Sequence, residues 1–273
     1  MRLFLLPIST RRTLIYCQRL HAGATEPASW LEKGRVRATN LWASWEKKES
    51  GWQRKVVDYG NQALKRIPYE EWGLKSIPAL STRRKEEEVS GRDKVQVSFP
   101  ASLIPEERVL EILRRLATER QGLHKSKMIW SIVGMPLVAP FALVPVIPNL
   151  PFFYLVFRAW SHYTALSGSR HLEFLVNQKL VMPQPSKILD ELYAGSKEPF
   201  GNPNPTESGD ERMVLHAADH KRFAETLEFP ELSIELTRAV WQVEKALKAE
   251  AEKNLRGAPE REDEKQNGTP KTK

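Results

Sequence analysis

A run of thirty residues without a charged side chain, Met128–Phe157, constrains this chain more than any other feature. The hydrocarbon core of a bilayer is about 30 Å thick and takes roughly 20 apolar residues as a helix. Each proline in the run disturbs the helical turn before it, and lipid does not tolerate unpaired backbone groups. The run therefore predicts a membrane-embedded segment whose kinks and turn lie at Pro136, Pro140, Pro145, Pro148, Asn149 and Pro151.

Two topologies fit this segment, and we favour a hairpin or re-entrant pair over one straight span. The residues from Pro148 to Pro151 provide a turn between two arms that are each near the minimal spanning length. Basic residues flank both ends, which satisfies the positive-inside tendency when both ends face the matrix. An aromatic and basic rim typical of a membrane interface follows the run: Arg158, Trp160, His162 and Tyr163.

The rest of the chain is polar and basic, which excludes a multi-span carrier. Charged residues make up 28% of the 273 positions, and the net charge is +8. Carriers of the secondary-transporter type need many apolar segments arranged as repeats, and this sequence has no second apolar run. The positive charge suits anionic lipid headgroups. No RNA- or DNA-binding motif supports a nucleic-acid partner.

The first twenty residues contain four arginines and no acidic residue, a composition typical of a mitochondrial targeting segment or transit peptide. The arginines are Arg2, Arg11, Arg12 and Arg19. The alternative is a basic strand or arm of the folded protein. The two interpretations are compatible, because an uncleaved N-terminus can also direct a protein to mitochondria.

The remaining periodicity predicts a mainly α fold: an α-helical, membrane-anchored protein with one proline-broken apolar hairpin or span and amphipathic helices on either side. An apolar stripe from Trp42 to Ile67 indicates one helix, and Pro105 marks the start of another. Ser167–Ser169 is expected to break the chain, and a further helix is expected from Glu211. The expected regions are 1–20 (basic targeting segment), 21–80 (Trp-rich helices), 81–94 (charged linker), 95–127 (strand and juxtamembrane helix), 128–166 (membrane-embedded segment), 167–250 (C-terminal helices) and 251–273 (disordered charged tail).

Few side chains suggest chemistry. His216 and His220 are spaced like a zinc-binding pair on a helix, but Ala217 stands where the zinc-enzyme motif has a glutamate. His124, His162 and His171 are expected to be membrane-interface residues rather than a proton relay. No nucleophile triad, phosphate-binding glycine loop or cysteine cluster is present. We therefore expect no enzyme activity, catalytic residue, metal site or cofactor.

The distribution of carboxylates is more informative. No Asp or Glu occurs between Glu119 and Glu173. Cation–proton antiporters generally use carboxylates within the membrane as the exchangeable site. Backbone carbonyls of broken helices could hold K⁺, and His162 could carry a proton, but one span or hairpin is a poor pathway without partners.

Several segments resemble the mitochondrial K⁺–H⁺ exchange-related family of fungal proteins. They are RLFLLPISTRRTLIYC (2–17), LVPVIPNLPFFYLVFRAWSHY (143–163), SRHLEFL (169–175) and EFPELSIELTRAVWQ (228–242). The resemblance implies an inner-membrane role in potassium and matrix-volume homeostasis. It transfers no catalytic residue, because we know of none assigned in the family.

These observations together predict a mitochondrial inner-membrane protein that is required for K⁺/H⁺ exchange or regulates it. A subunit or regulator is favoured over a complete carrier because of the missing carboxylates. The alternative is a membrane-anchored scaffold or assembly factor with an indirect effect on ion balance. The expected partners are inner-membrane lipids and other membrane subunits of an exchange complex, with no nucleic acid.

Overall fold

A four-stranded sheet organises the helices of this chain. The computed structural model describes residues 1–18, 37, 44–45, 47–48, 50–80, 82–90, 94–140, 150–195, 211–216 and 218–257. The strands in these ranges are β1 (Arg2–Pro7), β2 (Thr13–Gln18), β3 (Val95–Phe99) and β4 (Val181–Pro185). The helices are α2 (Trp52–Lys65), α3 (Tyr69–Ser76), α4 (Thr82–Ser90), α5 (Glu106–Thr118), α6 (Gln121–Val138), α7 (Leu150–Asn177), α8 (Lys187–Leu192), α9 (His220–Thr226) and α10 (Pro230–Gly257).

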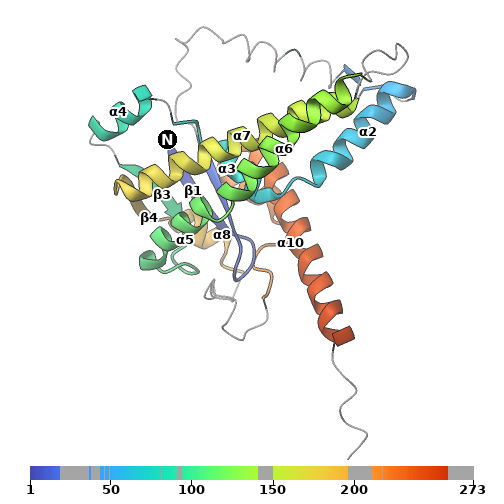
Figure 1. Cartoon of the computed structure of the whole chain (residues 1–273). Coiled ribbons are helices and arrows are strands. Elements are labelled where there is room, and N and C mark those ends of the chain that lie inside the picture. The colour runs from blue at the N-terminus through green and yellow to red at the C-terminus, as the bar shows by residue number, and fades with distance from the viewer. Residues whose placement is uncertain are drawn as a thin grey trace, which may run out of the picture.

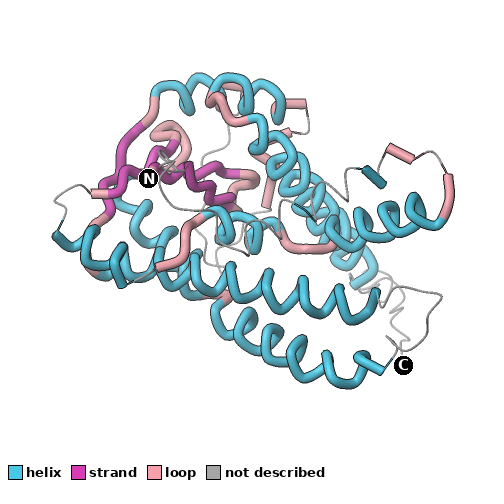
Figure 2. The backbone as a smooth tube through the Cα atoms, turned by 90° about the horizontal axis from the view of Figure 1, so that it is seen from above, coloured by secondary structure: helices cyan, strands magenta, loops and turns pink. Residues whose placement is uncertain are grey.

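The strand order is β2-β1-β3-β4, with β1 and β2 antiparallel and the pairs β1–β3 and β3–β4 parallel. Parallel neighbours need long crossover connections, which here contain α2 to α4 and then α5 to α7 (Figures 1 and 2). Strand β1 is buried from Leu3 to Pro7, as expected for a central strand covered on both faces. Pro183 and Pro185 lie in β4, an edge strand, where a missing N–H is tolerated.

The prediction of a mainly α fold is therefore wrong, because the N-terminal residues belong to the sheet. Residues 2–7 and 13–18 form the β1–β2 hairpin, which is the strand alternative considered for this segment. Arg2 begins β1, and Arg11 and Arg12 lie in the turn between the strands, whereas Arg19 is outside the described residues. The side chains of Leu3, Leu5, Leu6 and Ile8 are completely buried in the core.

The expected membrane-anchored architecture is also not observed. The charge-free run is divided between the C-terminal half of α6 and the start of α7. Both helices carry charged residues outside the run. Among the helices in the described ranges, none is both long enough and apolar enough to cross a bilayer.

The prolines of this run take different places. Pro136 lies inside α6, and Pro140 lies just beyond the end of that helix. Pro151 lies in the first turn of α7, where a missing N–H costs no helical hydrogen bond. Pro145, Pro148 and Asn149 lie outside the described residues, so the expected turn there stays a prediction.

Other local predictions have mixed outcomes. The short strand at 95–99 and the helix after Pro105 are confirmed as β3 and α5. The charged stretch expected to be a linker forms α4 over residues 82–90. Helix α7 passes through Ser167–Ser169 without a break, and the helix expected from Glu211 begins only at His220.

Helix α3 packs closely against β2 and α7, and a glycine at each contact allows the backbones to approach. A Cβ atom on Gly73 would lie 2.6 Å from the Ile15 carbonyl oxygen of β2, and one on Gly168 would lie 2.0 Å from the Leu74 carbonyl oxygen. The Gln242 side chain of α10 accepts a hydrogen bond from the Tyr69 N–H and donates one to the Ile67 carbonyl. These contacts fix the position of α3, and with it Glu71.

Candidate functional site

A group of polar side chains is enclosed where α3, α6 and α7 meet. We call this group the buried polar cluster; it comprises Glu71 and Lys75 of α3, His124 of α6, and Arg158, Ser161 and His162 of α7. Glu71, His124 and His162 are each at most 2% exposed. Burying a charge costs free energy unless the charge is paired and hydrogen-bonded, so the contacts inside the cluster decide what it can do.

Glu71 accepts most of these contacts. Both of its oxygens face the Arg158 guanidinium, at 3.0 and 3.2 Å, in a bidentate pair. Ser161 donates its hydroxyl hydrogen to Glu71 Oε1 and accepts a hydrogen bond from Lys75 Nζ at 2.7 Å. Lys75 also lies 3.5 Å above the centre of the Trp72 ring, a cation–π contact. One carboxylate therefore balances two buried cations.

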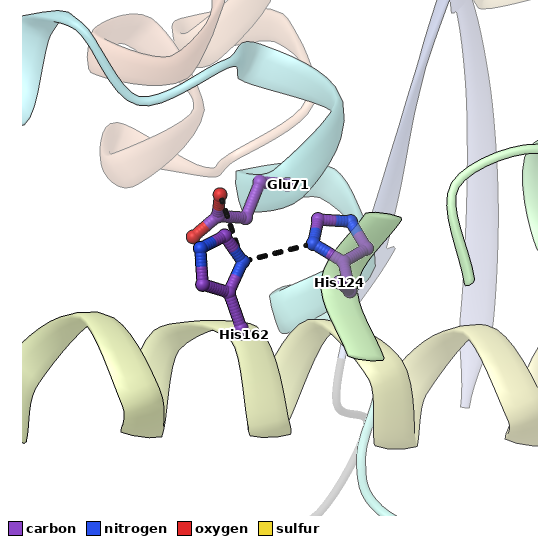
Figure 3. Close-up of side chains that lie close together, drawn as sticks. All are labelled: Glu71, His124 and His162. Carbon is purple, nitrogen blue, oxygen red and sulfur yellow. Dashed lines mark hydrogen bonds and ion pairs between the residues drawn. The ribbon is translucent and has the colours of Figure 1, made fainter. Parts of the chain in front are cut away.

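The two histidines continue this network: Figure 3 shows His162 in contact with His124 and facing Glu71, whose Oε2 lies 3.7 Å from His162 Nδ1. Arg158 Nη2 lies 2.8 Å from His162 Nε2. A guanidinium has only donors, so His162 Nε2 accepts and its Nδ1 carries the hydrogen when the ring is neutral. That N–H points to His124 Nδ1 at 3.0 Å. His124 Nε2 then carries the last hydrogen, and it has no hydrogen-bond partner among the described residues.

Burial and charge shift the pKa values of the cluster in a consistent way. Burial lowers the pKa of His162 to about 4, helped by Arg158, His124 and Lys127 and opposed by Glu71. Burial also lowers the pKa of His124, with Arg120, Arg158 and Lys75 acting in the same direction and Glu71 opposing. At neutral pH both imidazoles are therefore uncharged.

The other two titrating groups also have lowered pKa values. Burial lowers the pKa of Lys75 to about 8, against the opposing effect of Glu71. Burial alone would raise the pKa of Glu71, but the Ser161 hydrogen bond and the charge of Arg158 hold it below its usual value. Glu71 is thus ionised, and Lys75 loses its proton at a mildly basic pH.

Glu71, His124 and His162 also form the group of metal-ligand side chains that the described part of the chain brings together, with one ligand atom of each within 4.8 Å of the others. His162 Nδ1 lies 3.0 Å from His124 Nδ1 and 3.7 Å from Glu71 Oε2, spacings that a tetrahedral zinc site with metal–ligand distances of about 2.0–2.1 Å could span. The hydrogen bonds oppose this use, because a metal at His162 Nδ1 would place the ring hydrogen on Nε2, facing the Arg158 donor. The arrangement therefore suits two neutral, hydrogen-bonded imidazoles better than a metal site.

Acid should destabilise the fold through these imidazoles. A histidine whose pKa is lowered on folding binds fewer protons in the folded state, so stability falls as pH drops from 6.5 towards 4. From pH 7 to pH 5, His162 alone should remove about 2 kcal/mol from the free energy of unfolding. Urea titrations at the two pH values measure this loss. The His162→Gln variant should show a smaller loss, whereas His216→Gln, at an exposed position, should match the wild type.

The structure separates the residues of the expected membrane rim. Trp160 and Tyr163 are 46% and 57% exposed, whereas Arg158 and His162 turn inward to Glu71. His171, also expected at an interface, is buried between the Pro78 carbonyl and Glu88.

The histidine pair in HAADH does not share a helix face. His216 precedes α9, and His220 begins it. His216 is exposed. The sequence interpretation of these two residues as unrelated to a zinc enzyme stays a prediction.

Sequence reasoning missed Glu71, Lys75 and Ser161. Glu71 and Lys75 lie in the segment PYEEWGLKSIPAL (68–80), just after the apolar stripe that ends at Ile67. The available signal was Pro68 followed by two glutamates, the same start pattern that identified α5. Nothing local indicated that Glu71 would face α7, because the two segments are 87 positions apart at the Arg158 contact.

Comparisons with known proteins identify relatives of this chain. The mitochondrial K⁺–H⁺ exchange-related family matches residues 2–176, which include every residue of the buried polar cluster. An uncharacterized protein of Schizosaccharomyces pombe is 29% identical over 198 residues, covering 70% of this chain and 82% of that protein. An uncharacterized protein of Saccharomyces cerevisiae is 23% identical over 273 residues, covering 88% and 84%. No solved structure matches.

Proposed function

Because this chain belongs to the mitochondrial K⁺–H⁺ exchange-related family, we propose that it is a non-enzymatic subunit or regulator of K⁺/H⁺ exchange at the mitochondrial inner membrane. We propose further that it responds to pH through the buried polar cluster. The observation that carries this proposal is the hydrogen-bonded chain from Glu71 and Arg158 through His162 to His124. Each of its imidazoles lies between helices and among cations, so a proton gained there opposes the packing.

The cluster supports a pH response because proton uptake there has a structural cost. A proton on His162 would face the cations Arg158 and Lys127, with Glu71 as the carboxylate neighbour among the described residues. A proton on His124 would add the repulsion of Arg120. Moving α6 or α7 away from α3 relieves this repulsion by admitting water. Protonation is thereby coupled to the position of the α6–α7 pair.

The same helices carry a surface suited to contact with other subunits or lipid. Large apolar side chains are exposed on the charge-free part of α6 and on the first half of α7: Ile129, Trp130, Ile132, Val133, Leu137, Phe153, Tyr154 and Val156. Exposed apolar patches of this kind mark protein or membrane interaction sites. We propose that this surface contacts the membrane-embedded subunits of an exchange complex and the lipids of the inner membrane.

A regulator or subunit fits the carboxylates better than a complete carrier does. Carriers generally bind the exchanged ion at a carboxylate that is available within the apolar region. The sequence has no acidic residue between Glu119 and Glu173. Glu71 is the carboxylate next to His162, and both of its oxygens are paired with Arg158.

Loss of the protein should slow K⁺/H⁺ exchange in mitochondria. Deleting the gene is expected to reduce the rate of swelling in potassium acetate, and nigericin, an artificial K⁺/H⁺ exchanger, should restore it. Re-expressed wild-type protein should restore the rate as well. The Lys75→Gln variant should restore it with an altered dependence on matrix pH, since Lys75 loses its proton near pH 8.

Two results would contradict parts of this proposal. Normal swelling in the deletion strain would discard the ion-exchange role and leave a scaffold or assembly factor as the function. Rapid K⁺/H⁺ exchange by the purified chain in liposomes loaded with a pH dye would show a complete carrier instead of a regulator. We expect little exchange in that assay.

A further inference from the structure

A second polar site lies beside α3, outside the buried polar cluster. It is a cavity of about 350 Å³ between the β1–β2 turn, the start of α3 and the end of α5. Four arginines and two glutamates are among its lining residues, so its lining carries an excess of positive charge. The arginines come from two different places in the fold: Arg11 and Arg12 from the turn, and Arg115 and Arg120 from the end of α5 and just beyond it.

The arginine contacts leave donors for a ligand. Arg12 forms an ion pair with Glu211, with Nε 3.2 Å from a carboxylate oxygen. Arg120 forms one with Glu70, with one Nη 2.6 Å from a carboxylate oxygen. A guanidinium has five N–H donors, so a single contact of this kind uses a minority of them. The Arg120–Glu70 pair is partly exposed on both sides, and ion pairs of this kind add little stability. An incoming anion can therefore compete with Glu70 at low cost, and Arg12 can bind it through Nη while its Nε keeps the contact with the largely buried Glu211.

Two hydroxyl groups at the cavity give an independent reason to expect a ligand. The hydroxyl of Thr13, a lining residue, is buried and has no hydrogen-bond partner among the described residues. A buried hydroxyl without a partner loses free energy that an acceptor in the cavity would restore. Tyr69, which is 4% exposed, also lines the cavity, and burial raises the pKa of its hydroxyl well above the ordinary value, so it stays a neutral donor.

The remaining lining indicates the kind of anion. The apolar side chains of Ile15, Leu74 and Ile112 also line the cavity. The volume exceeds what a single inorganic phosphate fills and lies at the lower end of the range for small-molecule sites. Arginine forks bind phosphate oxygens in bidentate pairs. From these features we propose that the cavity binds an organic phosphate, with its phosphate on Arg12, Arg120 and Tyr69 and its organic part on the apolar residues.

Such a group has two sources, a soluble organic phosphate or the headgroup of a phospholipid. Binding of the purified full-length protein to ADP by calorimetry tests the first source. Binding to phosphatidylcholine vesicles with and without phosphatidic acid tests the second. Saturable binding to either probe supports the proposal and identifies the source. Absence of binding to both overturns it.

Matched variants show whether the binding is at this cavity. Arg120→Gln should weaken binding at least about tenfold, since it removes a charged hydrogen bond to phosphate. Arg114 lies in α5 but does not line the cavity, so the Arg114→Gln variant should bind like the wild type. Tyr69→Phe removes only one oxygen, so it should fold and still weaken binding severalfold. Equal weakening by Arg120→Gln and Arg114→Gln, or none with Tyr69→Phe, would overturn the assignment.

This binding assay uses no measure of ion exchange. A normal swelling rate in the deletion strain would leave the cavity proposal intact, and a failure to bind phosphate would leave the exchange proposal intact.

Discussion

Replacing Glu71 by glutamine is expected to lower the free energy of unfolding by about 3–5 kcal/mol. The substitution preserves the shape of the side chain but removes the carboxylate that balances Arg158 and Lys75. Glu71 is 1% exposed, and the side chains of these two cations are at most 13% exposed. Breaking one partner of a buried ion pair leaves an uncompensated charge in a medium of low polarity, which costs far more than losing a surface pair. Urea denaturation at pH 7 measures the change.

Two comparison variants separate charge from packing. Glu70→Gln, the adjacent substitution, breaks the partly exposed Arg120 pair and should cost less than about 1 kcal/mol. Glu71→Gln combined with Arg158→Gln removes both opposite charges, so it should be more stable than Glu71→Gln alone. If the single and double variants are equally unstable, packing and not charge explains the effect of Glu71.

Replacing Gly168 by alanine is the second change with a large expected effect. The added Cβ would lie 2.0 Å from the Leu74 carbonyl oxygen and 3.2 Å from that of Ile77. Both atoms are backbone, so α7 would have to move away from α3. We expect a loss of about 3 kcal/mol or more, at the upper end for overpacked sites. The movement should also separate Ser161 and His162 from Glu71, because these residues lie on the same two helices.

Gly122→Ala is the matched control for this substitution. Gly122 is also helical, in α6, and a Cβ there would meet nothing within 4 Å. Alanine has a higher helix propensity than glycine, so this variant should be as stable as the wild type or up to about 1 kcal/mol more stable. Thermal unfolding of the two variants distinguishes the outcomes. A Gly168→Ala variant as stable as Gly122→Ala would show that the α3–α7 contact tolerates an added methyl group.

Local patterns were sufficient for some elements of this fold. Alternation from Val95 to Phe99 predicted β3, and Pro105 followed by two glutamates predicted the start of α5. Both signals depend only on neighbouring residues. The segments quoted for the family resemblance also lie mostly within the matched residues 2–176.

The N-terminal strands were harder to recognise for a physical reason. A strand with one buried face alternates apolar and polar residues, but β1 is buried on both faces and therefore appears as the continuous run Leu3–Leu6. With arginines at Arg2, Arg11 and Arg12, this run looks like a targeting segment. Only the pairing of β1 with β3, some ninety residues later, identifies it as a central strand.

For the candidate site, too, some features follow from the sequence and others only from the tertiary structure. The sequence by itself determined the charge-free run and the absence of acidic residues between Glu119 and Glu173. Only the tertiary structure decided that Glu71 and Arg158 enclose His162 and that His124 completes the chain, because these residues meet through helices distant in sequence. The contact requires Gly73 and Gly168, whose missing side chains let α3 approach β2 and α7. Periodicity cannot show such an approach, since it reports which face of a helix is apolar and not which helix that face will meet.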